Sequence, residues 1–133
     1  MFLDVLNKDE KEWFMDLAIK ATEANGEVAK EEINMLHAFA AEMKIPARTK
    51  CERDLDSILK DFVDNSSKKS MKVVLFELIG IIFADNEFDD AEKKFINSVT
   101  DSFQISSELK DEMISEINEY SSLFNKICNT VLQ

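Results

Sequence analysis

Apolar residues recur along this chain at steps of three and four positions, which is the spacing of one face of an α-helix. The sequence holds only two Gly and one Pro, fewer turn residues than a fold of many short strands would need. The pattern therefore predicts an all-α fold, a compact bundle of about seven helices. The predicted helices run over about 8–24, 30–43, 50–65, 67–84, 89–103, 106–119 and 121–132.

Polar residues mark several of the predicted helix boundaries. Asn7 and Glu10 have the spacing of a capping box, in which each side chain accepts a hydrogen bond from the other residue's backbone N–H. Pro46 forbids continuation of the second helix. The pairs Thr49 with Glu52 and Asp89 with Glu92 have capping-box spacing too, and they predict the starts of the third and fifth helices.

The segment 67–84 is apolar around most of its circumference, which predicts a helix packed on several sides at the centre of the fold. Gly80 within it costs about 1 kcal/mol of helix propensity, and we interpret it as the point of a close helix crossing. The last predicted helix, 121–132, is expected to return to the body of the fold. Its packing residues would be Leu123, Phe124, Ile127, Cys128 and Val131.

The chain contains an internal repeat at an offset of 60 residues. With that shift, the linker Ala-Asn-Gly-Glu-Val at 24–28 aligns with Ala-Asp-Asn-Glu-Phe at 84–88, and Glu32 aligns with Glu92. Apolar positions on either side of the linkers also align. The repeat predicts two helix-loop-helix copies, about 8–65 and 66–121, related by an approximate two-fold within a single domain over 1–133.

Composition and charge exclude several classes of function. With 133 residues, 45% of them hydrophobic, the chain is long enough for one globular core. Its net charge of -11 is spread along the chain and disfavours both nucleic acid and anionic lipid as partners. The longest apolar run is well short of the roughly 20 residues that cross a bilayer. The first residues lack the features of a secretory signal, so we expect a cytoplasmic protein with free thiols at Cys51 and Cys128.

Acidic residues crowd the two linkers, and two interpretations stand. Carboxylates are stabilised at helix N-termini by the helix dipole, and they are also the ligands of hard divalent cations such as Mg²⁺, Ca²⁺ or Mn²⁺. An EF-hand is excluded, because Asp90 stands where the loop needs Gly and Ile96 where it needs Glu. The candidate metal ligands are Asn25, Glu27, Glu32, Asp85, Glu87, Asp89 and Glu92.

Other polar residues favour structural roles. We expect His37 to be a partly buried structural histidine. We expect Glu77 to lie at a solvent-exposed edge of its helix or to pair with Lys69 or Lys72. Five acidic residues on one side of the sixth predicted helix indicate a solvated face. They are Glu108, Asp111, Glu112, Glu116 and Glu119. No catalytic residues or phosphate-binding loop can be assigned from motifs.

The repeated linker with its following Glu32 or Glu92 resembles the linker of the TerB-like family, first associated with tellurite resistance. The resemblance covers about residues 8–103. It implies a compact all-helical domain, found alone or attached to modules such as a J-domain co-chaperone. It also implies a metal-binding role for Asn25, Glu32, Asp85 and Glu92, and a stress-response context.

Three functions remain open on the sequence. The first is a non-catalytic cytoplasmic interaction module, which presents an acidic or apolar helical face to a protein or holds a divalent cation. The second is a metal-assisted hydrolase, or a subunit of one, using the same carboxylates. The third is a structural homodimer, which would be recognised by a large apolar patch on the surface of the molecule.

Overall fold

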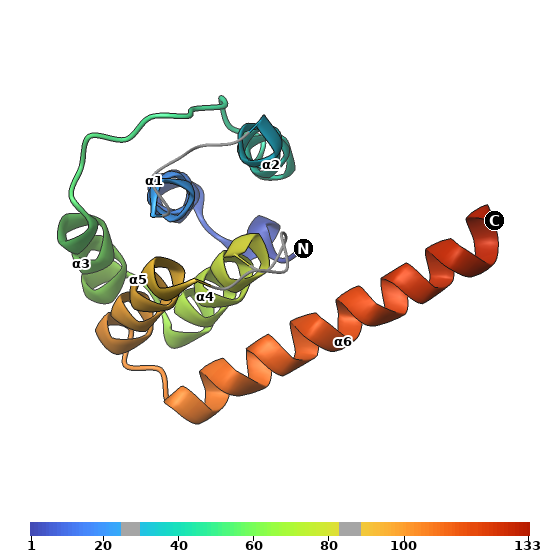
Figure 1. Ribbon diagram of the computed structural model, residues 1–133. Helices are drawn as coiled ribbons and strands as arrows, with labels where there is room; N and C mark the ends of the chain where they lie inside the picture. Colours follow the sequence, from blue (N-terminus) through green and yellow to red (C-terminus); the bar gives the residue numbers. More distant parts are fainter. Residues whose placement is uncertain (25–29, 83–88) are drawn as a thin grey trace.

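The computed structural model describes residues 1–24, 30–82 and 89–133, and within these ranges the chain is helical with no strand. The predicted all-α fold is confirmed, and the described ranges contain six α-helices where the sequence predicted about seven (Figure 1). They follow a short 3₁₀ turn, η1 (Leu3–Val5). The helices are α1 (Lys8–Glu23), α2 (Lys30–Met43), α3 (Leu55–Asn65), α4 (Lys68–Ile82), α5 (Asp90–Ser102) and α6 (Ser107–Leu132).

The core lies between α1 and α4, which contact each other and most of the remaining helices. α1 packs against α2 and α3, whereas α4 packs against α5, α6 and η1. Phe62 joins the two groups, because its ring meets Trp13 edge-on at 5.4 Å and Phe103 at 5.6 Å. The predicted central position of α4 is confirmed, since Val74, Leu75, Leu78 and Ile79 are fully buried.

Two of the three predicted capping boxes are present. Asn7 Oδ1 accepts from the Glu10 N–H at 2.9 Å, and Asp89 Oδ1 accepts from the Glu92 N–H at 2.8 Å. In both, the glutamate side chain accepts from the N–H of the capping residue. The sequence therefore predicted the starts of α1 and α5 correctly.

The predicted start of α3 directly after Thr49, with Thr49 as its cap, is wrong. The helix begins at Leu55, and its N-cap is Asp54, whose Oδ1 accepts from the Ser57 N–H at 2.7 Å. The preceding residues, 45–54, form a loop that crosses α1.

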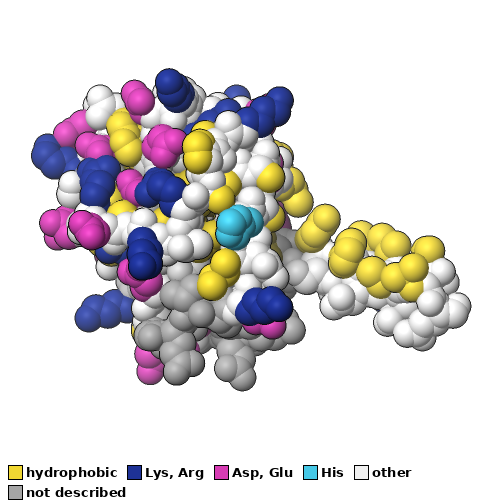
Figure 2. All heavy atoms as spheres, turned by 90° about the horizontal axis from the view of Figure 1, so that it is seen from above, with side chains coloured by type: hydrophobic (Ala, Val, Ile, Leu, Met, Phe, Trp, Pro, Cys, Tyr) yellow, Lys and Arg dark blue, Asp and Glu magenta, His cyan; other side chains and the backbone are white. Residues whose placement is uncertain are grey.

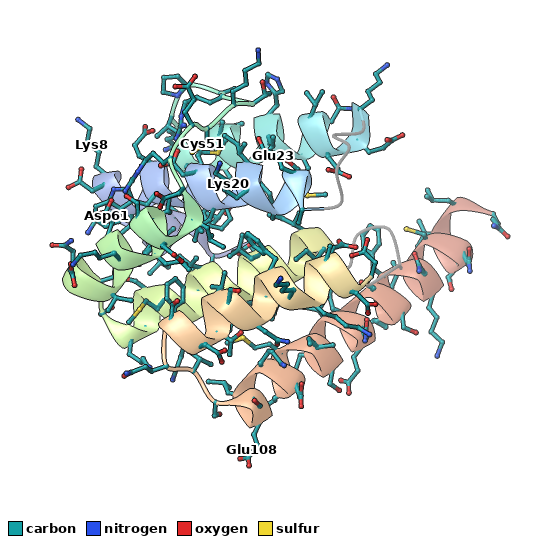
Figure 3. All side chains as sticks on the ribbon, turned by 60° about the vertical axis from the view of Figure 1, so that its left-hand side comes forward. Lys8, Lys20, Glu23, Cys51, Asp61 and Glu108 are labelled. Atoms are coloured by element: carbon teal, nitrogen blue, oxygen red, sulfur yellow. The ribbon has the colours of Figure 1, made fainter. Side chains whose placement is uncertain are left out.

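Ionic contacts with α1 explain the extended loop. Arg48 and Arg53 both reach the buried carboxylate of Asp16, at 2.8 and 3.5 Å. Lys20 Nζ donates to the Cys51 carbonyl at 3.1 Å, and Figure 3 labels both residues at this crossing. A helix starting at Thr49 would break the loop's contacts with α1, and these outweigh the weak local signal of a capping box.

The predicted return of residues 121–132 to the body is also wrong. α6 is one continuous helix of 26 residues, and its second half projects away from the other helices (Figure 1). The physical reason is local, because residues 119–122 contain neither Gly nor Pro and nothing interrupts the helical hydrogen bonds there. Leu123, Phe124, Ile127 and Val131 are consequently exposed, and Cys128 is half-buried.

Two further residues differ from their predicted environments. His37 is exposed on α2, because the buried side of that helix is formed by Leu36, Ala40 and Met43. At Gly80 no helix of the described chain crosses closely, since an added Cβ would meet no heavy atom within 4 Å.

Several helix boundaries match at the offset of 60 residues, although the internal repeat itself stays a prediction. α1 and α4 begin at Lys8 and Lys68, and α2 and α5 begin at Lys30 and Asp90. The ends of α2 and α5 match as well, because Lys44 and Gln104 both adopt positive φ, at 59° and 54°. The copies diverge afterwards, where the first continues into the loop 45–54 and the second into α6. A two-fold relation between the copies stays a prediction.

Candidate functional site

The most unusual surface of the molecule is on the projecting half of α6. Large apolar side chains recur there at steps of three and four, which places them within about 100° of arc on one side of the helix. We call this surface the distal stripe. It consists of Tyr120, Leu123, Phe124, Ile127 and Val131, which are 50–70% exposed.

Figure 2 shows the hydrophobic side chains gathered along the projecting end of α6. The opposite side of the helix carries the exposed polar residues Ser122, Asn125 and Asn129. α6 is therefore amphipathic where it projects, with an apolar side that the described part of the chain leaves exposed.

Charge changes abruptly along α6. The first half carries the five acidic residues that the sequence predicted to be solvated, and all five are exposed. In residues 120–133, by contrast, Lys126 is the only charged side chain. The distal stripe is thus a nearly uncharged surface on a chain whose net charge is -11.

A groove of about 550 Å³ lies beside the stripe, where α6 separates from the body. Its apolar walls come from Phe2, Phe76 and Gly80 on one side and from Ile117 and Tyr120 of α6 on the other. The Phe2 ring meets Phe76 edge-on at 5.6 Å, and Phe2 remains nearly half exposed. Because Tyr120 belongs to both surfaces, the groove and the distal stripe are continuous.

Glu77 holds the N-terminal wall of the groove in place. Its carboxylate lies 3.0 Å from the amino group of Met1 and accepts from the Phe2 N–H at 2.7 Å. Glu42 accepts from the Met1 amino group at 3.2 Å and from the Leu3 N–H at 3.1 Å. The predicted partners of Glu77, Lys69 or Lys72, are therefore wrong.

These contacts change the acidity of the Met1 amino group. Burial lowers its pKa, but the hydrogen bonds and negative charge of Glu77 and then Glu42 raise it by more, so the pKa lies above the usual value of 8.0. The amino group remains protonated at neutral pH, and its ion pairs with Glu42 and Glu77 hold the N-terminal segment against α2 and α4.

The candidate metal ligands are only partly described. Asn25, Glu27, Asp85 and Glu87 lie outside the described residues. Asp89 and Glu92 form the capping box of α5, and Glu32 lies in the first turn of α2. Among the described residues, no group of three or more His, Cys, Asp or Glu is arranged to hold a metal ion. The divalent-cation site stays a prediction.

Sequence reasoning missed the distal stripe as a surface, although a signal was present. The spacing of Ile117, Tyr120, Phe124, Ile127 and Val131 alternates between three and four through the predicted break near residue 120. That regular spacing indicates one continuous helix.

Of the helices in the described ranges, none combines the length and apolarity that a bilayer-spanning segment needs.

Comparison of the chain with protein-family models, curated proteins and solved structures finds no match. The resemblance to the TerB-like family, which rests on the two linkers, therefore stays a prediction. The function has to be argued from the surface of the molecule itself.

Proposed function

We propose that this chain is a non-catalytic protein-interaction module that docks on a protein partner through the distal stripe. The observation that supports the proposal is the exposure of five large apolar side chains on one side of α6. At roughly 100 Å² of exposed area each, they form a patch of about 500 Å². A contiguous apolar patch of this size on a soluble domain is typical of an interaction site.

The chemistry of α6 favours a protein partner over a lipid surface. Helices that lie in a membrane interface carry many Lys and Arg on their polar side, which attract anionic headgroups. Lys126 is the only basic residue in this segment, and the rest of the chain is strongly acidic. An apolar stripe with small polar residues behind it fits the groove of another protein, in the manner of other helix-in-groove contacts.

The linker resemblance to the TerB-like family suggests the setting of this module, a stress response in the cytoplasm. The acidic linkers would then be a second feature of the same module, open to a divalent cation. The proposal concerns the distal stripe and does not depend on that cation.

Occupancy of the stripe can be measured by thiol labelling in cells. In a Cys51→Ala, Cys128→Ala background, we compare Leu123→Cys on the stripe with Asn129→Cys on the opposite side of the helix. Both positions are exposed in the structure, so a dilute purified chain should label at similar rates at the two. In cells, we expect labelling at position 123 to slow by about ten-fold and labelling at 129 to stay unchanged, because a partner covers only the stripe. Equal rates at both positions in cells would show that the stripe is bare and would refute the proposal.

A further inference from the structure

We infer that the partner of the distal stripe is a second copy of this chain, and that the end of the stripe of each copy lies in the groove at Gly80 of the other. This inference rests on the proposed function and names its partner. It is supported by the space at Gly80, by the continuity of the two apolar surfaces, by the area that the pairing would cover and by the distribution of charge.

Gly80 is the first argument. A glycine within a helix costs about 1 kcal/mol relative to alanine, and such a residue is most easily explained where another backbone approaches closely. Gly80 lines the groove, and a Cβ added to it would meet no heavy atom within 4 Å. The described chain therefore supplies no element that needs this glycine. A helix arriving from another molecule would use the open space.

Both surfaces carry aromatic and branched apolar side chains, and Glu116 also lines the groove. The groove is walled by Phe2, Phe76, Ile117 and Tyr120, and the stripe presents aromatic and branched apolar side chains. The stripe extends away from the groove by 11 residues, from Tyr120 to Val131, or about 16 Å at the rise of an α-helix. Two α6 helices lying antiparallel thus bring the end of each stripe to the groove of the other copy, in a closed symmetric pair.

The area is sufficient for a specific dimer only when both stripes are covered. The distal stripe of each copy contributes about 500 Å², so the two stripes together contribute about 1,000 Å². With the smaller area of the two grooves added, the pairing reaches the lower limit of specific protein interfaces. Covering one stripe alone would bury about half of that area, so the contact has to be mutual.

The charge distribution favours contact between two copies through the uncharged segment that carries the distal stripe. Two chains of net charge -11 repel each other over most of their surfaces. Residues 120–133 carry no acidic side chain, so two copies approach through this segment with the least repulsion. The antiparallel arrangement also keeps the two acidic bodies at opposite ends of the paired helices.

The test is sedimentation equilibrium of the purified full chain at about 100 μM in 150 mM NaCl, with three variants. We expect the unmodified chain to sediment at twice its mass of 15.3 kDa. Gly80→Leu places a branched side chain in the groove, and its Cβ would meet no described heavy atom within 4 Å. Phe124→Glu with Ile127→Glu destroys the stripe, and Ser122→Glu with Asn129→Glu adds the same charge to the polar side as a matched control.

We expect Gly80→Leu and the stripe variant each to weaken association by at least ten-fold, and the control to leave it within about two-fold. Gly80→Leu should also melt no lower than the unmodified chain, because it replaces a poor helix former with a good one. This separates loss of pairing from loss of folding.

Each contrary outcome has a definite meaning. A monomeric unmodified chain overturns the second copy as partner, and binding of that monomer to vesicles of anionic lipid would identify the occupant as a membrane. A dimer that survives Gly80→Leu but not the stripe variant overturns the groove as the receiving site. If the chain is monomeric and position 123 is nevertheless protected in cells, the proposed function stands and this inference fails.

Discussion

A single carboxylate, Glu77, organises the N-terminal side of the molecule. It is buried in the apolar second half of α4, where its oxygen accepts from the Phe2 N–H and lies 3.0 Å from the charged Met1 amino group. A buried carboxylate is expensive unless it is paired and hydrogen-bonded, and here both conditions are met. The contact places Phe2 against Phe76 and so forms one wall of the groove.

At the residue scale, Glu77→Gln should destabilise the chain by about 1–2 kcal/mol at pH 7, because the amide still accepts from Phe2 but no longer pairs with the Met1 amino group. The folded pKa of that amino group is raised above 8.0, so its stabilisation is complete below pH 8.0 and is lost as pH rises through the folded value. The difference between the variant and the unmodified chain should therefore shrink towards pH 10. Urea unfolding at pH 7 and pH 10 measures this, with the exposed Glu116→Gln as control. A difference that is the same at both pH values would contradict the ion pair.

Two of the three pairs predicted from short spacing are present, whereas the distant partners of Glu77 were not predicted. The residues of each pair, Asn7 with Glu10 and Asp89 with Glu92, are three positions apart. That spacing is sufficient to predict the reciprocal hydrogen bonds of a capping box. Glu77 pairs with a backbone amino group 76 positions away, which no side-chain pattern reveals. For Gly80, the sequence suggested a close crossing that the described chain lacks, and we now assign that crossing to a second molecule.

At the scale of an element, the start of α3 tests which cap operates. Asp54→Ala should cost about 1 kcal/mol of unfolding free energy, because the Ser57 N–H loses its acceptor. Thr49→Ala should change stability by less than about 0.5 kcal/mol, since Thr49 precedes the helix and is exposed. Urea unfolding of both variants measures the difference. A larger loss for Thr49→Ala would restore the helix start that the sequence suggested.

The elements that sequence reasoning placed wrongly are those whose ends are decided by tertiary contacts or by their absence. Contacts of Arg48 and Arg53 with the buried Asp16 hold the loop 45–54 in an extended form, although Thr49 and Glu52 have capping spacing. α6 shows the opposite case. Apolar residues 121–132 were expected to pack on the body, but a helix without a breaker continues whether or not its apolar side is covered. Apolar spacing predicts an amphipathic helix, and it does not say which molecule covers it.

For the whole molecule, the class of fold was predicted correctly from the sequence. The candidate site was not, because the sequence suggested the acidic linkers and the structure favours the distal stripe. The acidic linkers were chosen because dense carboxylates suggest a cation, and four of the seven candidate residues lie outside the described ranges. The distal stripe has the stronger physical argument, because exposed apolar area has a direct free-energy cost that binding removes. Of the three functions that the sequence left open, both the interaction module and the homodimer can use an exposed apolar helical face such as the distal stripe.

An acidic chain that pairs through an uncharged stripe should associate more tightly as salt is added. Between about 50 and 300 mM NaCl the screening length falls by roughly half, which weakens the repulsion between two chains of net charge -11 but leaves apolar contacts nearly unchanged. We expect the dimer dissociation constant, measured by sedimentation, to fall several-fold over this range. Glu116→Gln with Glu119→Gln, which removes acidic charge beside the groove, should tighten pairing at 50 mM NaCl and reduce the salt effect. A dissociation constant that rises with salt would mean that ion pairs hold the two copies together, and the stripe would then be the wrong interface.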